Sequence, residues 1–234
     1  MNFNAKLSKF WVSMFEKGAY RRVVTGLKNT VIIAVLGLVI GIVIGTLIAV
    51  IRVVPKTNKL VKALDKIAAV YVAFFRGTPM VAQLLIGYFV LLPLLNIKLS
   101  SLAVCVLIFG LNSGAYVSEI MRSGLLSVDI GQTEAGRALG LSFASTMMRI
   151  VVPQAVKNIL PTIGNEFITL IKETSIVSFV GAVDLYSAFN YIGSANYEFM
   201  VPYLSMALIY IVLVLGISGL IKIMERRLRA GDKR

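Results

Sequence analysis

The chain has 234 residues, of which 58% are hydrophobic and 15% are charged, and its mean hydropathy is +0.85. Soluble domains are about 45–50% apolar and about 25% charged, so this composition excludes a soluble enzyme. A disulfide-stabilised scaffold is also excluded, because Cys105 is the only cysteine and lies in an apolar run.

A membrane-spanning helix needs about 20 apolar residues. Four stretches without Lys, Arg, Asp or Glu meet this length: 29–51, 77–97, 99–118 and 199–221. We therefore expect a polytopic, all-α membrane protein.

The formal net charge of +13 does not indicate a nucleic-acid partner, because the basic residues lie where the expected membrane topology places them. Most basic residues fall in three regions, which lie after the first apolar stretch, around the polar central segment and at the end of the chain. They are Arg52, Lys56, Lys59, Lys62 and Lys66, then Arg122, Arg137, Arg149 and Lys157, then Lys222, Arg226, Arg227, Arg229, Lys233 and Arg234. With alternating crossings these regions share one side, which the positive-inside rule makes cytoplasmic.

Residues 1–26 are expected to form an amphipathic segment on the membrane surface. Apolar side chains recur there at helical spacing among lysines, at Phe3, Leu7, Phe10, Trp11, Met14 and Phe15. A transmembrane domain is expected over residues 27–225, with a basic cytoplasmic tail over 226–234. Its five spans are predicted at about 27–51, 67–95, 99–121, 159–180 and 201–223.

Two of these spans carry features of their own. Pro79 and Gly77 interrupt the second span, which is therefore predicted to be kinked or broken. A broken helix at membrane depth requires surrounding protein or a water-filled cavity. In the first span Gly37, Gly41 and Gly45 recur every four residues. This pattern either lets a neighbouring helix approach closely or reflects the ordinary frequency of glycine in membrane helices.

Five crossings and a cytoplasmic C-terminus place the N-terminus outside. Basic residues near the N-terminus oppose this orientation: Lys6, Lys9, Lys17, Arg21, Arg22 and Lys28. We keep the N-terminus outside, because the positive-inside rule biases the whole count and is not absolute at one end.

Polar side chains inside the spans are costly and normally face a bundle interior or a pathway. Asn112, Tyr116 and Glu119 lie on one helical stripe with Ser113 beside it, and Gln83 follows the break. The fourth span carries Glu166, Lys172 and Thr174 together with Glu173. Two interpretations remain open: these residues line a hydrophilic path, or they pair with one another or with Arg76 and hold the bundle together.

The segment at about 130–153 is predicted to contain a short cytoplasmic helix. Glu134 lies early in it, where the helix dipole favours an acid, and Gly140 ends it. Ala135, Gly136 and Ala138 leave a surface with almost no side chains. Taken alone, such a helix either packs on its own bundle or docks on another protein.

This segment resembles the E-A-A-x3-G-x9-I-x-L-P loop of the permeases of ATP-binding-cassette (ABC) importers. The matching residues are Glu134, Ala135, Gly140, Ile150 and Pro153, while Gly136 replaces an alanine and Val152 a leucine. Further blocks resemble the polar amino-acid subfamily, and these are 75–79 with Gln83, 112–120, 153–155, 164–167 and 225–231. The resemblance covers nearly the whole chain.

The resemblance implies the type I ABC importer permease fold, with five spans and a cytoplasmic coupling helix. Two permease subunits, identical or homologous, would form a pathway for a polar or charged amino acid across the bacterial plasma (inner) membrane. Two ATPase subunits would bind ATP and Mg²⁺ and contact Glu134, Ala135, Gly136, Arg137 and Gly140. An extracytoplasmic binding protein would deliver the amino acid. In the pathway itself, the acids Glu119, Glu166 and Glu173 opposite Lys172 suit an amino acid's ammonium and carboxylate groups.

The chain itself is not expected to be an enzyme or to hold a cofactor or metal. It has no histidine, no G-x-x-x-x-G-K-[ST] phosphate loop and no metal-binding cluster. An ion-coupled secondary amino-acid carrier is the alternative, since such carriers also use broken helices and buried carboxylates, but five spans without an internal repeat argue against it. An intramembrane enzyme is disfavoured by the lack of histidine and the single cysteine.

Overall fold

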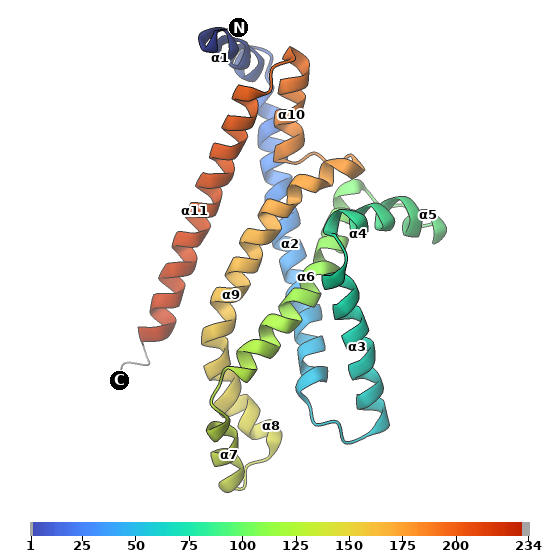
Figure 1. Ribbon diagram of the computed structural model, residues 1–234, viewed down its shortest axis with the longest axis vertical. Helices are drawn as coiled ribbons and strands as arrows, with labels where there is room; N and C mark the ends of the chain where they lie inside the picture. Colours follow the sequence, from blue (N-terminus) through green and yellow to red (C-terminus); the bar gives the residue numbers. More distant parts are fainter. Residues whose placement is uncertain (1, 231–234) are drawn as a thin grey trace.

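The computed structural model describes residues 2–230, and every regular element within that range is helical (Figure 1). The α-helices are α1 (Phe3–Trp11), α2 (Tyr20–Val53), α3 (Lys59–Gly77), α4 (Met80–Ile86), α5 (Leu92–Leu94), α6 (Ser101–Leu126), α7 (Ile130–Ala138), α8 (Phe143–Thr146), α9 (Val152–Glu173), α10 (Leu185–Asn196) and α11 (Met200–Ala230). Three π-helical turns (Val12–Glu16, Gly87–Leu91 and Met147–Val151) and a 3₁₀ helix (Thr174–Val180) complete the chain. The all-α prediction is confirmed.

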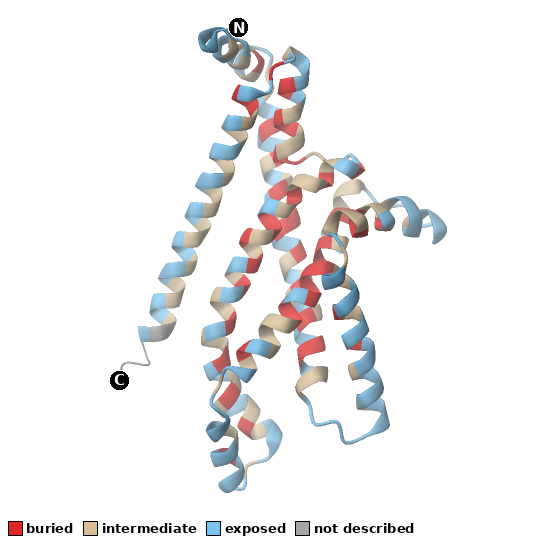
Figure 2. Cartoon of the chain, in the orientation of Figure 1, coloured by how far each residue is buried: buried red, intermediate tan, exposed pale blue. Residues whose placement is uncertain are grey.

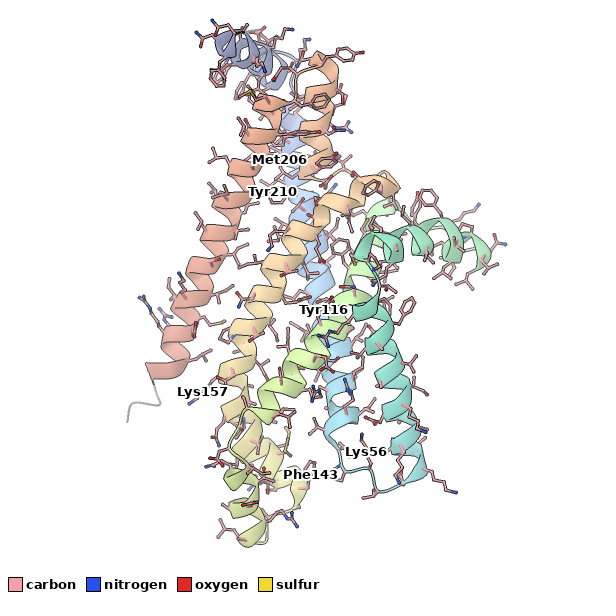
Figure 3. The ribbon with its side chains drawn as sticks, viewed as in Figure 1. Lys56, Tyr116, Phe143, Lys157, Met206 and Tyr210 are labelled. Atoms are coloured by element: carbon pink, nitrogen blue, oxygen red, sulfur yellow. The ribbon has the colours of Figure 1, made fainter. Side chains whose placement is uncertain are left out.

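The two ends of this elongated molecule are built from different segments (Figure 1). One end, which we call the α1 end, consists of α1, α10 and the start of α11. The opposite end, the α7 end, contains α7, α8 and the connection between α2 and α3. Figure 3 places Lys56 and Phe143 at the α7 end as well. The long helices run between these two ends.

Three helices are long and apolar enough to cross a membrane on their own within the described range: Tyr20–Val53, Ser101–Leu126 and Met200–Leu228. A fourth candidate is the pair Lys59–Gly77 and Met80–Leu94, which bends by 107° at its break. The predicted interruption at Gly77 and Pro79 is therefore confirmed. Helix α9 is not among these apolar candidates and carries the charged side chains predicted for the fourth span. It packs against α2, α6 and α11.

Several boundaries differ from those predicted. Helix α2 begins at Tyr20, so it takes in part of the predicted surface segment, and α11 continues to Ala230 through the start of the predicted tail. No proline or glycine ends either helix at the membrane boundary, so the helix continues into polar sequence. The end of the tail, 231–234, lies outside the described residues. Helices α8 and α10 were not predicted.

The fourth predicted span, 159–180, is an α-helix only as far as Glu173. Beyond it the Thr174 hydroxyl donates to the Ile171 carbonyl at 2.7 Å, and the Ser175 hydroxyl donates to the Lys172 carbonyl at 3.1 Å. Such side-chain bonds compete with the regular backbone pattern, and the chain continues as a 3₁₀ helix over Thr174–Val180.

The core lies between α2 and α6, which pack with almost no space between their backbones. Gly37, Gly41 and Gly45 of α2 face α6, and a Cβ atom on Gly41 would lie 2.6 Å from the Ser113 Oγ. In the 18-residue apolar stretch that could span a membrane, 56% of α6 is buried inside the protein, against 33% of α2 and 0% of α11 (Figure 2). The glycine ladder therefore permits close helix packing, and α6 is the centre of the bundle.

Candidate functional site

The carboxylate of Glu119, on α6, lies among three arginine side chains. Arg122, one turn further along α6, donates to Glu119 Oε2 from Nε at 3.2 Å and from Nη2 at 3.0 Å. Arg52, at the end of α2, donates to Oε1, and Arg76, at the end of α3, lies 3.8 Å from Oε2. The Arg76 guanidinium also lies 5.5 Å from the ring centre of Tyr116, which Figure 3 labels on α6. Glu119 and Tyr116 therefore belong to an arginine cluster that ties α2, α3 and α6 together.

Gln83 and Asn112 lie at the break between α3 and α4, and both are buried. The Gln83 amide donates to the carbonyls of Phe75 at 2.9 Å and Thr78 at 3.0 Å, and to the Thr78 hydroxyl at 2.8 Å. The Asn112 amide, on α6, donates to Gln83 Oε1 at 2.9 Å. Because Pro79 has no N–H, the broken helix leaves carbonyl groups without their usual partners. The side-chain amides of Gln83 and Asn112 supply hydrogen-bond donors in place of the missing backbone N–H groups, and so they hold the bend.

Glu166 and Ser113 form a third group, in the contact between α9 and α6. The Ser113 hydroxyl donates to Glu166 Oε1 at 3.1 Å, and both residues are buried. Within residues 2–230 no lysine or arginine forms an ion pair with Glu166, in contrast to Glu119. A buried carboxylate with a neutral partner is costly, and in a membrane span it marks a functional group more often than a structural one.

Lys172 and Thr174 do not join the other predicted pathway residues. Lys172 is exposed near the end of α9. Thr174 is buried, but its hydroxyl lies 3.5 Å from the hydroxyl of Thr30 on α2. The structure thus divides the predicted set into the arginine cluster, the helix break, the Ser113–Glu166 pair and these two separate residues.

The predicted cytoplasmic helix is α7, and both of its ends have sequence causes. Asp129 caps the start, since its carboxylate accepts from the Gly131 N–H at 2.7 Å. Gly140 follows the end with a φ of 72°, and the Leu141 N–H donates to the Gly136 carbonyl at 3.0 Å, as in a Schellman motif. The prediction that Gly140 ends this helix is confirmed.

The small residues of α7 do not share one exposed surface. Gly136 is buried, and a Cβ atom on it would lie 2.6 Å from Thr146 Cγ2 of α8. The glycine that replaces alanine here therefore makes room for α8. Glu134, Ala135, Arg137 and Gly140 are exposed. Two large apolar side chains beside them are exposed too, Ile130 at 74% and Leu139 at 78%.

Sequence reasoning missed three features of the site. It did not single out Arg52 and Arg122 as partners of Glu119, although Arg122 follows at the helical spacing of three. It also missed α10, whose signal is the capping box that Asp184 and Ser187 form at its start. Thr30, which accepts from the Leu185 N–H at 3.4 Å, could not be found without the fold.

Comparisons with known proteins identify relatives of this chain in sequence and in fold. The arginine transport system permease protein ArtQ of Bacillus subtilis (strain 168) is 44% identical over 166 residues, which are 71% of this chain and 76% of that protein. The L-cystine transport system permease protein TcyB of the same organism is 38% identical over 169 residues, 72% of each chain. A crystal structure of an amino acid ABC transporter with histidines superposes with a TM-score of 0.83 at 38% identity, covering 92% of this chain and 97% of that one.

Residues 37–230 match the family described as binding-protein-dependent transport system inner membrane component. The matched range contains the arginine cluster, the helix break, the Ser113–Glu166 pair and α7. The chain belongs to the family of binding-protein-dependent transport system inner membrane components.

Proposed function

We propose that the chain is the permease subunit of an ATP-driven importer for a polar or charged amino acid in the bacterial plasma membrane. The likeness to an amino acid ABC transporter, at 38% identity over 92% of the chain, carries this proposal. ArtQ and TcyB, which are named as permeases for arginine and L-cystine transport, support the same substrate class. Membership of a binding-protein-dependent family favours this function over an ion-coupled carrier.

In the proposed topology the chain crosses the membrane five times, through α2, the broken helix α3–α5, α6, α9 and α11. The α7 end faces the cytoplasm, because Lys56, Lys59, Arg137, Arg149 and further basic residues lie in its connections. Single cysteines in a Cys105→Ala background test this orientation. Tyr197→Cys is expected to react with a membrane-impermeant reagent added outside, while Thr57→Cys does not. Labelling of Thr57→Cys from outside would overturn the orientation.

Glu166 is the residue that we propose for direct contact with the amino acid. It lies about 10 Å along α9 from Glu173, at 1.5 Å per residue, and therefore within the hydrocarbon core. Its carboxylate accepts a hydrogen bond from the Ser113 hydroxyl and pairs with no cation among the described residues. The ammonium group of an amino acid would supply the missing positive charge. Gln83 and Asn112 shape the path by holding the helix break, and Tyr116 and Glu119 border it within the arginine cluster.

Helix α7 is the proposed contact for the ATPase subunits, which would bind ATP and Mg²⁺. Ile130 and Leu139 expose apolar side chains at an end of the molecule that we place in the cytoplasm. Exposed apolar side chains of this size are typical of a covered interface. Glu134, Ala135 and Arg137 would surround them, while Gly136 packs against α8.

The assembly would contain two permease subunits, two ATPase subunits and an extracytoplasmic amino-acid-binding protein. Co-purification tests it: a tagged copy of this chain is expected to retain an ATPase subunit and a second permease subunit in detergent. Purification as a single polypeptide, with uptake driven by a proton or sodium gradient, would establish the carrier instead.

A further inference from the structure

The N-terminal segment, residues 2–17, is fastened to the corner between α10 and α11. Lys6 Nζ lies 3.4 Å from Glu198 Oε1, and the Asn196 amide donates to the Ser13 hydroxyl at 2.6 Å. Glu198 also accepts from the Met200 N–H at 3.1 Å, at the start of α11. Beneath these contacts, Phe10 packs on a buried cluster formed mainly by α10. The segment is therefore a fixed part of the α1 end.

This segment has two exposed faces of different character. One is an apolar stripe at a spacing of four residues, formed by Phe3, Leu7, Trp11 and Phe15. Such a stripe suits the interface of the bilayer, with the helix axis in the membrane plane. The other face is polar and carries Ser8 and Lys9 beside the end of α10. The polar face is thus turned toward the solution.

Two adjoining grooves lie along α10, one beside the polar face and one beside the start of α2, with volumes of about 350 Å³ and 290 Å³. Lys17 lines both, so the grooves form one continuous surface, which we call the basic groove. Lys9, Arg21 and Arg22 supply its other charges. No aspartate or glutamate is among the described residues that line it.

Two tyrosines border the basic groove. Tyr197 is 94% exposed and has a φ of 50°, so the chain holds an aromatic ring in solution from a backbone conformation that few residues adopt. The ring of Tyr191 lies 4.6 Å from the Arg22 guanidinium. The positive φ of Tyr197 is that of the residue that caps the end of α10. Exposed tyrosine beside arginine is typical of binding interfaces.

The position of these charges opposes the positive-inside rule. Basic residues at the outer end weaken the preferred orientation of a membrane protein, so their presence there calls for a cause. Lys6 has one in its ion pair with Glu198. Arg21 contacts Tyr20 and Arg22 lies over Tyr191, but no ion pair within residues 2–230 accounts for either. Lys9, Lys17, Arg21 and Arg22 all line the basic groove.

We propose that the basic groove is the docking surface for an acidic face of the extracytoplasmic binding protein. The inference rests on the proposed function and orientation, and the family description supplies the kind of partner. A protein surface fits better than lipid phosphates, because the apolar stripe supplies a separate face for lipid, while Tyr197 lines the groove with Ser8 and Lys9 and is 94% exposed. The opposite charges of the two surfaces would steer the binding protein toward the permease, and the Tyr197 ring would insert into the binding protein as an anchor.

The test uses the complete importer in nanodiscs and measures ATP hydrolysis against the concentration of its binding protein. The double variant Lys9→Glu/Lys17→Glu is expected to raise the half-saturating concentration about tenfold, with the larger effect at low salt. Tyr197→Ala is expected to raise it as well, and the exposed ring contributes nothing to folding. Lys98→Glu is the control, since it reverses the charge of one lysine, as each groove substitution does, in a loop that the proposed topology places outside and that does not line the groove.

An unchanged half-saturating concentration in both groove variants would overturn the inference while leaving the proposed function intact. A shift that occurs with phosphatidylglycerol present and vanishes in phosphatidylcholine alone would assign the groove to lipid and overturn it too. Failure of the binding protein to stimulate the wild-type importer would instead contradict the proposed function, and this inference with it.

Discussion

Asn112 and Gln83 are joined side chain to side chain where the second apolar segment breaks, with the Asn112 amide 2.9 Å from Gln83 Oε1. The same Gln83 amide group holds the carbonyls of Phe75 and Thr78. A bend of 107° is therefore stabilised by two polar side chains inside an apolar protein. Their polarity follows from the break itself, whether or not substrate passes beside them.

Replacing Gln83 by leucine is expected to destabilise the permease. It removes a donor to the Thr78 carbonyl and leaves the Phe75 carbonyl with only the longer bond of 3.4 Å from Asn112. The loss of such a partner costs about 1–3 kcal/mol. The melting temperature of the purified protein in detergent measures the effect, with Asn165→Leu on the exposed face of α9 as the control. An unchanged melting temperature together with lost transport would mean that Gln83 serves the pathway instead of the bend.

Glu166→Gln is expected to lower the initial rate of amino-acid uptake by at least about tenfold, the scale of a lost charged hydrogen bond. Assembly should be preserved, because the amide oxygen of glutamine still accepts from the Ser113 hydroxyl. The yield of assembled complex is measured beside the uptake rate. Ser113→Ala is the control, since it removes the hydroxyl that donates to position 166 but keeps the carboxylate. Parallel loss of yield and uptake in Glu166→Gln would show that the carboxylate holds the bundle.

Gly41→Ala is expected to destabilise the protein by about 1–3 kcal/mol through overpacking, because the added carbon would lie 2.6 Å from Ser113 Oγ. Gly216→Ala, in α11, is the matched control. Nothing lies within 4 Å of its added carbon, so it should be neutral or stabilising. Thermal melting of the two variants is compared, and equal melting temperatures would contradict the close α2–α6 contact.

Leu139→Ser and Glu134→Lys are expected to leave the permease inserted and folded but to weaken its retention of the ATPase. Leu139 is 78% exposed, so its side chain contributes little to the fold. Retention is measured by co-purification, with Lys62→Ser as the control at another exposed site of the α7 end. If both variants keep a full complement of ATPase, α7 does not form the contact.

The sequence predicted the features that depend on local chemistry. Pro79 interrupts a helix wherever it stands in the interior, and Gly140 adopts the positive φ that ends α7. Glycines every four residues in α2 were consistent with a close helix neighbour, but the ordinary frequency of glycine in membrane helices explained them equally well until the α2–α6 contact was known. The conclusions on Pro79 and Gly140 need only neighbouring residues and a bilayer, so the fold class and the position of the break followed from the sequence alone.

Features that depend on contacts distant in sequence were not accessible. The ion pair of Arg52 and Glu119 joins positions 67 residues apart. Gly136 resembled part of a docking surface until its contact with Thr146 of α8 was known. The polar stripe on α6 left open whether its members line a path or hold the bundle together, and the structure places them in an ion-pair cluster, at a helix break and beside a buried carboxylate. Periodicity identifies a polar face but not the partner of each residue on it.

The central claim is that this chain forms the pathway of an ATP-driven amino-acid importer. Its most direct test is uptake of radiolabelled amino acids into proteoliposomes that contain the permease and its ATPase, with ATP enclosed and the binding protein outside. We predict uptake that requires both ATP and the binding protein and that persists when ion gradients are collapsed. Uptake that needs neither, but stops when a proton or sodium gradient is removed, would contradict the account.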